Sequence, residues 1–321
     1  MSFRLYVYYM ALGGAWAALV AWGVSWIVFG SAGQTDWWKL LLEASGKGSL
    51  LGAFLGALLG ALDALSSSGG RVSAIAPRAG VGLLLGGLAG LVGGGIGQAL
   101  AFITEYLRIV GWLVAGALIG LAISVWDLVM LLLARQKTQG ALRKLRNGAL
   151  GGVVGGVLGG LALLIIGQLL TPLLSRTQTP ISPAAIGWTI LGALIGLAIG
   201  LAQVILRDAW VIVESGFRPG RDILISKPVV TIGRAEGCDI GLYGAKGVEK
   251  NHARILMDGA EYFIEDCQTP GGTFVNEKRI AEKQRLQSGD RIRVGECVLL
   301  FRARARRRAV DSRSVAPTAL G

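Results

Sequence analysis

The sequence predicts a membrane-embedded all-α bundle of six helices, built as three repeated hairpins and followed by a C-terminal all-β sandwich. The 321 residues have a mean hydropathy of +0.58, and only 16% of them are charged. Such a composition is typical of membrane proteins. From Trp210 onward, short β-prone runs replace the long apolar ones. We expect a transmembrane domain at 1–208, a cytosolic domain at 209–305 and a basic, disordered tail at 306–321.

The helical part is predicted from six apolar runs. A helix of about 20 residues crosses the roughly 30 Å of a bilayer's hydrocarbon core. The runs cover approximately 5–29, 49–65, 80–103, 110–134, 148–170 and 184–206. The first is too long for the core of a signal peptide and lacks a clear small-residue cleavage site, so we expect it to be retained as a transmembrane helix.

An internal repeat groups these runs into three hairpins. Asp63 recurs 64 residues later as Asp127, and Gln203 occupies the equivalent place in the third copy. Because each unit contains two helices, all copies would cross the membrane in the same orientation.

Glycines recur at every fourth position along several of the runs, which places them on one helical face. Examples are Gly52/Gly56/Gly60, Gly116/Gly120 and Gly192/Gly196/Gly200. Helix association in lipid relies on close backbone packing, which such stripes permit. We therefore expect tight packing within the bundle, although a pore or an oligomer interface would use the same spacing.

The orientation is predicted from the charges of the connecting segments. One side receives the larger number of basic residues: Arg4, Arg71, Arg78, Arg135, Lys137, Arg143, Lys144, Arg146 and Arg207. The positive-inside rule makes that side cytoplasmic. With an even number of spans, both termini of this multi-pass protein would lie in the cytoplasm, at the cell inner (plasma) membrane. Loop charges of this kind explain the net charge of +12 without a nucleic-acid partner.

The polar residues Asp63, Asp127 and Gln203 lie toward the cytoplasmic ends of their helices. Ionisable groups inside a membrane span are candidates for function. The structural alternative is a hydrogen bond or ion pair between helices. Its candidate partners are Arg71, Arg78 and Arg135.

The last third predicts a β sandwich. Short β-prone runs at 211–213, 222–226, 229–232, 253–257, 262–265, 273–275, 291–294 and 298–302 alternate with turn residues, as in all-β domains. All three cysteines lie here, without metal-ligand spacing. Their odd number indicates free thiols in a reducing compartment, and we expect neither a metal nor a cofactor.

Four motifs follow one another in this region: TIGR at 231–234, VEKNHA at 248–253, GTFVN at 272–276 and SGDRIRVG at 288–295. Their order and spacing resemble the forkhead-associated domain, a β sandwich that binds phosphothreonine peptides. The resemblance implies partner contacts from Arg234, Glu249, Lys250, Gly272, Thr273 and Asn276, and structural roles for Gly233 and His252. A phosphate needs converging charged donors, and arginine offers it a planar fork.

Two positions depart from the family pattern. Glu249 stands where the family has a phosphate-binding Ser, and Gly271 where it has an Asn. A carboxylate only accepts hydrogen bonds and carries the same sign of charge as phosphate. We therefore expect Glu249 to repel a phosphate and to pair with Arg234 or Lys250.

These observations predict a membrane protein without enzymatic activity, because the one histidine and the cysteines form no catalytic constellation. Its cytosolic domain would bind a protein or phosphoprotein partner in signalling or scaffolding. The resemblance implies substrates of serine/threonine kinases as the partner class. The alternative is a channel or transporter regulated by that domain, and the oligomeric state stays open.

Overall fold

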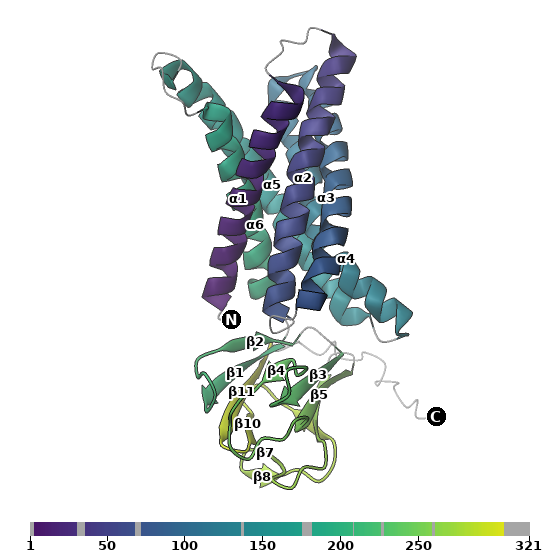
Figure 1. Ribbon diagram of the computed structural model, residues 1–321, viewed down its shortest axis with the longest axis vertical. Helices are drawn as coiled ribbons and strands as arrows, with labels where there is room; N and C mark the ends of the chain where they lie inside the picture. The colour runs from purple at the N-terminus through teal and green to yellow at the C-terminus, as the bar shows by residue number, and fades with distance from the viewer. Residues whose placement is uncertain are drawn as a thin grey trace, which may run out of the picture.

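A computed structural model describes residues 3–30, 36–67, 72–135, 138–174, 182–207, 209–225, 228–258 and 261–304. The predicted basic tail at 306–321 lies outside these residues, as do Arg71 and Lys137. A bundle of long helices stands on a β sandwich, and the first described residues lie at the end of the bundle that faces the sandwich (Figure 1).

Six long helices form the bundle. They are α1 (Phe3–Phe29), α2 (Trp37–Ser67), α3 (Val72–Ala101), α4 (Arg108–Leu133), α5 (Gln139–Leu174) and α6 (Pro183–Ile205), with the 3₁₀ turn η1 (Glu105–Leu107) before α4. All six are long and apolar enough to cross a membrane. Pro183 opens α6, where Ser182 caps the helix by accepting a hydrogen bond from the Ala184 backbone N–H at 3.3 Å.

Three helices begin earlier than their hydropathy predicts. α2, α3 and α5 start at Trp37, Val72 and Gln139, because charged and polar residues near their starts lower the local hydropathy without preventing a helix. The consequence is largest for α5. Hydropathy predicts Lys144 in a connecting segment, whereas the residue lies inside α5 with only 8% of its surface exposed.

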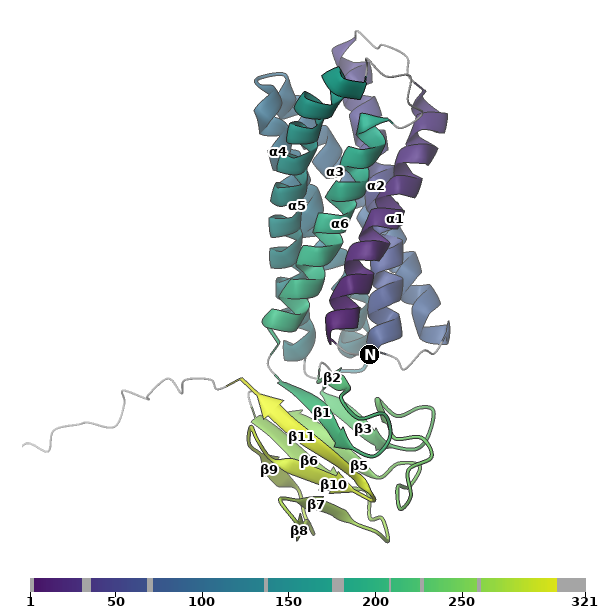
Figure 2. The ribbon, with the colours of Figure 1, turned by 90° about the vertical axis from the view of Figure 1, so that its left-hand side faces the viewer.

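The helices close into a ring. Each long helix packs against the next one along the chain, and α1 packs against α6. Figure 2 shows α1 and α6 side by side. Buried apolar residues of α2, α4 and α6 contribute most of the bundle core: Leu51, Leu55, Leu59, Ile119, Ile123, Leu191, Ile195 and Ile199.

Glycines bring neighbouring helices into backbone contact, as three of the helix pairs illustrate. A Cβ atom at the first glycine of each pair would collide with the carbonyl oxygen of the second: Gly52 with Gly86 (α2–α3), Gly116 with Gly152 (α4–α5) and Gly14 with Gly192 (α1–α6). Small residues are required wherever helix backbones approach this closely. A larger residue at these positions would push the helices apart.

Two sheets, in which most neighbouring strands are antiparallel, form the sandwich. Its strands are β1 (Ala209–Ser215), β2 (Asp222–Leu224), β3 (Val229–Gly233), β4 (Ile240–Gly241), β5 (Ala253–Asp258), β6 (Glu261–Asp266), β7 (Thr273–Val275), β8 (Lys278–Arg279), β9 (Gln284–Leu286), β10 (Arg291–Val294) and β11 (Cys297–Ala303). One sheet has the order β2-β1-β11-β10-β7-β8 and the other β4-β3-β5-β6-β9.

Alternating burial along the strands builds the core of the sandwich. Ile232, Ile255, Ile264, Leu299 and Phe301 are fully buried in it, as the period of two in a strand requires. All eight predicted strand regions contain a strand. The sequence analysis missed β4, β8 and β9, which have only two or three residues each and depend on pairing with their neighbours.

The bundle and the sandwich meet at Arg207, which follows α6. Its guanidinium lies 3.9 Å from the ring centre of Phe3 and 3.8 Å from that of Trp210. Stacking on two aromatic rings stabilises a cation. This contact joins the start of α1 to the first strand of the sandwich.

Replacement of Gly52 by Ala should destabilise the bundle by about 1–3 kcal/mol, because the added methyl group overpacks the α2–α3 contact. Gly23→Ala is the matched control, since a Cβ there meets no atom within 4 Å. Both changes improve helix propensity by about 1 kcal/mol. Thermal unfolding of the full-length protein in detergent measures the difference. Equal unfolding temperatures for the two variants would contradict the packing described for Gly52.

Candidate functional site

The predicted partner-binding loops meet where β3 ends. The backbone N–H of Arg234 donates to the Glu249 carbonyl at 2.9 Å, and that of Ala235 to the Lys250 carbonyl at 3.1 Å. A Cβ at Gly233 would collide with the Lys250 carbonyl oxygen. Glycine is therefore needed at 233 so that the loop carrying Arg234 can lie against the loop carrying Glu249 and Lys250.

His252 holds these loops from inside the domain. It is fully buried, and its Nδ1 accepts a hydrogen bond from the Glu249 N–H at 3.1 Å. Its Nε2 lies 3.1 Å from both the Gly272 carbonyl oxygen and the Thr269 hydroxyl. Since Nδ1 is an acceptor, the neutral ring carries its proton on Nε2 and can donate it to Gly272. One side chain thus ties the β4–β5 loop to the β6–β7 loop.

Asp266 supports the second of these loops. Its carboxylate accepts hydrogen bonds from the Thr269 N–H (2.9 Å), the Thr269 hydroxyl (3.0 Å) and the Thr273 hydroxyl (2.6 Å). Partial burial acts to raise the pKa of Asp266, but these hydrogen bonds outweigh it, so the pKa is lowered. Thr273, named above as a partner contact, is fully buried, and its hydroxyl faces this carboxylate.

The charged side chains of the site are open to solvent. Arg234 and Glu249 form an ion pair at 3.8 Å, with 51% and 48% of their side chains exposed. This is one of the two pairings expected for Glu249. An exposed pair of this kind contributes little stability. The pair places a negative charge beside Arg234, the residue predicted to contact a phosphate.

Asn276 lies at the turn between β7 and β8, with φ of 50°. Its side-chain amide donates to Asp290 at 2.9 Å and accepts from the Arg291 N–H at 3.0 Å. The exposed side chain is thus anchored to the loop before β10, and a peptide would compete with Asp290 for its N–H groups.

A further cation, Arg279, was missed by the sequence analysis. A Cβ at Gly272 would touch the Arg279 guanidinium, and Arg279 donates to the Pro270 carbonyl at 3.5 Å. β8 was not predicted, because the two-residue hairpin turn before it consists of Asn276 and Glu277, both with positive φ. The glycine that usually signals such a turn is missing.

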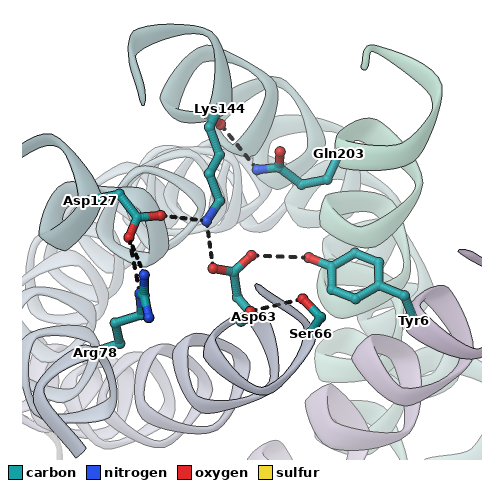
Figure 3. Close-up of polar contacts among 7 residues, drawn as sticks. All are labelled: Tyr6, Asp63, Ser66, Arg78, Asp127, Lys144 and Gln203. Atoms are coloured by element: carbon teal, nitrogen blue, oxygen red, sulfur yellow. Dashed lines mark hydrogen bonds and ion pairs between the residues drawn. The ribbon is translucent and has the colours of Figure 1, made fainter. Parts of the chain in front are cut away.

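The intramembrane candidates form a second polar cluster at the sandwich end of the bundle, shown in Figure 3. We call it the six-helix cluster, because it takes one side chain from each long helix. Its members are Tyr6 (α1), Asp63 (α2), Arg78 (α3), Asp127 (α4), Lys144 (α5) and Gln203 (α6).

Lys144 is the centre of the six-helix cluster. Its ammonium lies 2.6 Å from the carboxylate of Asp63 and 2.7 Å from that of Asp127. Its backbone carbonyl accepts a hydrogen bond from the Gln203 amide at 3.0 Å. The structure thus brings the three predicted residues together, around a lysine that was assigned to a connecting segment.

Two further bonds complete the cluster. Arg78 binds Asp127 with its guanidinium at 2.6 Å, and the Tyr6 hydroxyl donates to Asp63 at 3.4 Å. Arg78 is one of the ion-pair partners proposed in the structural alternative. The sequence signal for Lys144 was its place four residues before Gly148, on the same face of α5 as the glycine stripe.

The three cysteines are free thiols, as predicted. Burial raises the pKa of both Cys238 and Cys267, which keeps them in the thiol form. No group of three or more His, Cys, Asp and Glu side chains that could hold a metal ion occurs in the described part of the chain.

Replacement of Asp266 by Ala should destabilise the sandwich by about 1–2 kcal/mol near neutral pH, because three donors lose a charged acceptor. The folded-state pKa is lowered. The stabilisation is therefore present above the unfolded pKa of about 3.9 and is lost as the pH falls through the folded pKa. Thermal unfolding of wild type and variant should differ at neutral pH and converge in acid. Glu282→Ala, at an exposed position, is the control, and a gap that does not narrow in acid would contradict this role.

Comparisons with known proteins agree with this geometry. A family model described as FHA domain matches residues 230–295. FhaB of Mycobacterium tuberculosis is 28% identical over 110 residues, which are 34% of this chain and 70% of FhaB. The human E3 ubiquitin-protein ligase CHFR is 38% identical over 72 residues, which are 21% of this chain and 11% of the ligase.

Solved structures of FHA domains also match this chain, over a similar share of its length. One from a study of phosphothreonine-dependent FHA domain interactions is 26% identical and covers 30% of this chain and 98% of its own, with a TM-score of 0.28. The FhaA FHA domain, solved in complex with the intracellular domain of a second protein, is also 26% identical, with a TM-score of 0.27, and covers 29% of this chain and 99% of its own. Behind its six apolar helices, this chain therefore carries a forkhead-associated (FHA) domain at residues 230–295.

Proposed function

We propose that this protein is a multi-pass membrane protein that presents its FHA domain to a protein partner in the cytosol, in signalling or scaffolding. The observation that carries the proposal is the exposed loop site, where Arg234 and Lys250 lie on adjoining loops held by the buried His252. FHA domains are protein-binding modules that recognise phosphopeptides. The site faces solvent, so a partner can reach it without displacing the bundle.

Membrane insertion is supported by the outer surface of the bundle. Large apolar side chains on α3 and α5 are exposed, among them Leu84 (67%), Leu88 (61%) and Leu169 (65%). Soluble monomers rarely expose contiguous apolar surfaces of this kind. The exposed aromatic side chains of Trp26, Trp37, Trp38, Phe102 and Tyr106 belong to residues near the helix ends away from the sandwich, as in the aromatic belt of membrane proteins.

The distribution of basic residues supports a cytosolic FHA domain. Arg4, Arg78, Lys144 and Arg207 belong to the end of the bundle that joins the sandwich. At the other end, Lys39 and Lys47 are each paired with an acidic residue. By the positive-inside rule, the sandwich end is cytoplasmic. Both termini then lie on the cytoplasmic side of the inner (plasma) membrane.

Glu249 limits the contribution of phosphate to binding. Its carboxylate forms an ion pair with Arg234 at 3.8 Å. The family pattern has a hydroxyl donor at position 249 instead. A phosphate must displace this carboxylate and is repelled by it. Lys250, Arg279 and Asn276 remain as donors around the same loops. The domain thus combines a positively charged rim with one carboxylate that opposes a doubly charged ligand.

The alternative role, a channel or transporter regulated by the FHA domain, has one observation in its favour. Asp63, Asp127 and Gln203 converge on Lys144 rather than standing apart. Against it, the carboxylates are already neutralised by cations, and buried leucine and isoleucine side chains of α2, α4 and α6 fill the core beyond them. These contacts favour a structural role for the six-helix cluster.

Binding should be tested with the full-length protein in detergent, using a degenerate phosphothreonine peptide mixture and its unphosphorylated counterpart. We expect a measurable preference for the phosphorylated peptides, which Arg234→Ala removes because the guanidinium fork is lost. Arg285→Ala, which breaks an exposed ion pair with Glu261, is the control. Equal or absent binding of the two peptide mixtures by the wild type would exclude the phosphorylation-dependent form of the proposal.

Replacement of Glu249 by Ser should strengthen phosphopeptide binding by about three- to tenfold, because a repelling acceptor becomes a donor. Fluorescence anisotropy with a labelled phosphothreonine peptide measures the affinity. Glu265→Ser, which breaks the exposed pair of Glu265 with Arg254, removes one negative charge elsewhere and controls for net charge. An unchanged affinity in Glu249→Ser would show that this carboxylate does not control the site.

A further inference from the structure

A cavity of about 430 Å³ lies between the bundle and the sandwich. The bundle contributes the helix-end residues Phe3, Leu65 and Val204 together with part of the six-helix cluster. The sandwich contributes Phe217, Arg218, Arg221, Asp222, Asp239 and Tyr243. A volume of this size is within the range of small-ligand sites. It lies on the side of the domain that faces the bundle, whereas Arg234 and Glu249 do not line it.

The carboxylates that line the cavity already have partners. Asp63 is paired with Lys144 at 2.6 Å. Asp239 accepts hydrogen bonds from the N–H and the hydroxyl of Thr231, both at 3.1 Å. The third, Asp222, is close enough to Arg207 to oppose the lowering of the pKa of Arg207 by burial. Each of the three carboxylates therefore has a polar or charged partner, and Asp63 is paired with a cation.

The two arginines of the cavity are not compensated. Their guanidinium carbons lie 5.2 Å (Arg218) and 5.4 Å (Arg221) from the ring centre of Phe217. Neither has an ion-pair partner among the residues that the structure describes. Arg221 donates once, to the Gly241 carbonyl at 3.0 Å, and its Nε is buried without a hydrogen-bond partner. Burial, with the neighbouring charge of Arg218, lowers the pKa of Arg221.

An unpartnered buried donor is unfavourable until it gains an acceptor, and an anion that contacts both guanidinium groups would also reduce their mutual repulsion. Guanidinium groups bind phosphate oxygens with two parallel hydrogen bonds. The opposite wall is apolar where Phe3, Leu65 and Val204 line it. The site therefore favours an anion that carries an apolar group over a small hydrophilic anion.

We propose that this cavity binds the phosphate headgroup of an acidic phospholipid, with Arg218 and Arg221 holding the phosphate and the helix ends of α1, α2 and α6 contacting the start of the acyl chains. The lipid source rests on the proposed membrane insertion, because only then does the cavity lie at the level of the headgroups. A lipid in this position contacts both the bundle and the sandwich, so it would strengthen the contact between them.

The test is native mass spectrometry of the full-length protein in a maltoside detergent, titrated with dihexanoyl phosphatidylglycerol. Dihexanoyl phosphatidylcholine has the same chains without net charge, and glycerol 3-phosphate has the phosphate without the chains. We expect saturable binding of phosphatidylglycerol that exceeds that of both other probes. Arg218→Gln/Arg221→Gln should weaken it by at least about tenfold, whereas Arg285→Gln, remote from the cavity, should not change it.

Each other outcome has a defined meaning. Equal binding to the double variant and the wild type, or equal binding of the two lipids, would overturn the site. Glycerol 3-phosphate bound as tightly as phosphatidylglycerol would uphold the anion site and overturn the lipid as its source. Phosphopeptide binding through Arg234 is measured on the same variants. The double variant should retain it, so a failure of the lipid site and a failure of the proposed function are distinguishable.

Discussion

The ion pairs of Lys144 with Asp63 and Asp127 are the interaction on which the arrangement of the bundle depends. Charges inside an apolar bundle cost several kcal/mol each in lost hydration, and only close pairing with good geometry offsets that cost. The distances of 2.6 and 2.7 Å meet this condition. Arg78, Tyr6 and Gln203 complete the set. Four helices, α2 to α5, must therefore be in register before every charge has a partner, and all six before every hydrogen bond of the cluster forms.

The glycine contacts and this cluster act on the same helices. The glycines allow α2 to touch α3, α4 to touch α5, and α1 to touch α6 through their backbones. Such glycine contacts do not fix the position of one helix along the axis of its neighbour, because glycines recur at successive turns of the same helix. The polar cluster supplies that selectivity, since a shift of one turn would leave Lys144 or Asp127 buried without a partner. Four of its members, Tyr6, Asp63, Lys144 and Gln203, also line the cavity between the bundle and the sandwich.

Within the FHA domain, His252 has a comparable role on a smaller scale. Its ring joins the loop of Glu249 to the loop of Gly272, and Asp266 holds the second loop through two threonines. The polar groups inside the domain therefore position the exposed ones. Arg234 and Glu249 can change their partners at little cost in stability, because hydrogen bonds inside the domain hold the loops that carry them.

The sequence alone determined the six apolar helices, the β-sandwich region and the FHA motifs, because each depends on local period, length or short-range spacing. It also indicated the pairing of Glu249 with a neighbouring cation, because the family pattern assigns both residues to the same binding site. The tertiary structure decided the partners of Asp63, Asp127 and Gln203, the place of Arg279 and the cavity of Arg218 and Arg221. Each of these joins residues from distant elements. Hydropathy predicts Lys144 in a connecting segment, because a charged residue is expected to be exposed. Only the folded bundle supplies the two carboxylates that allow its burial.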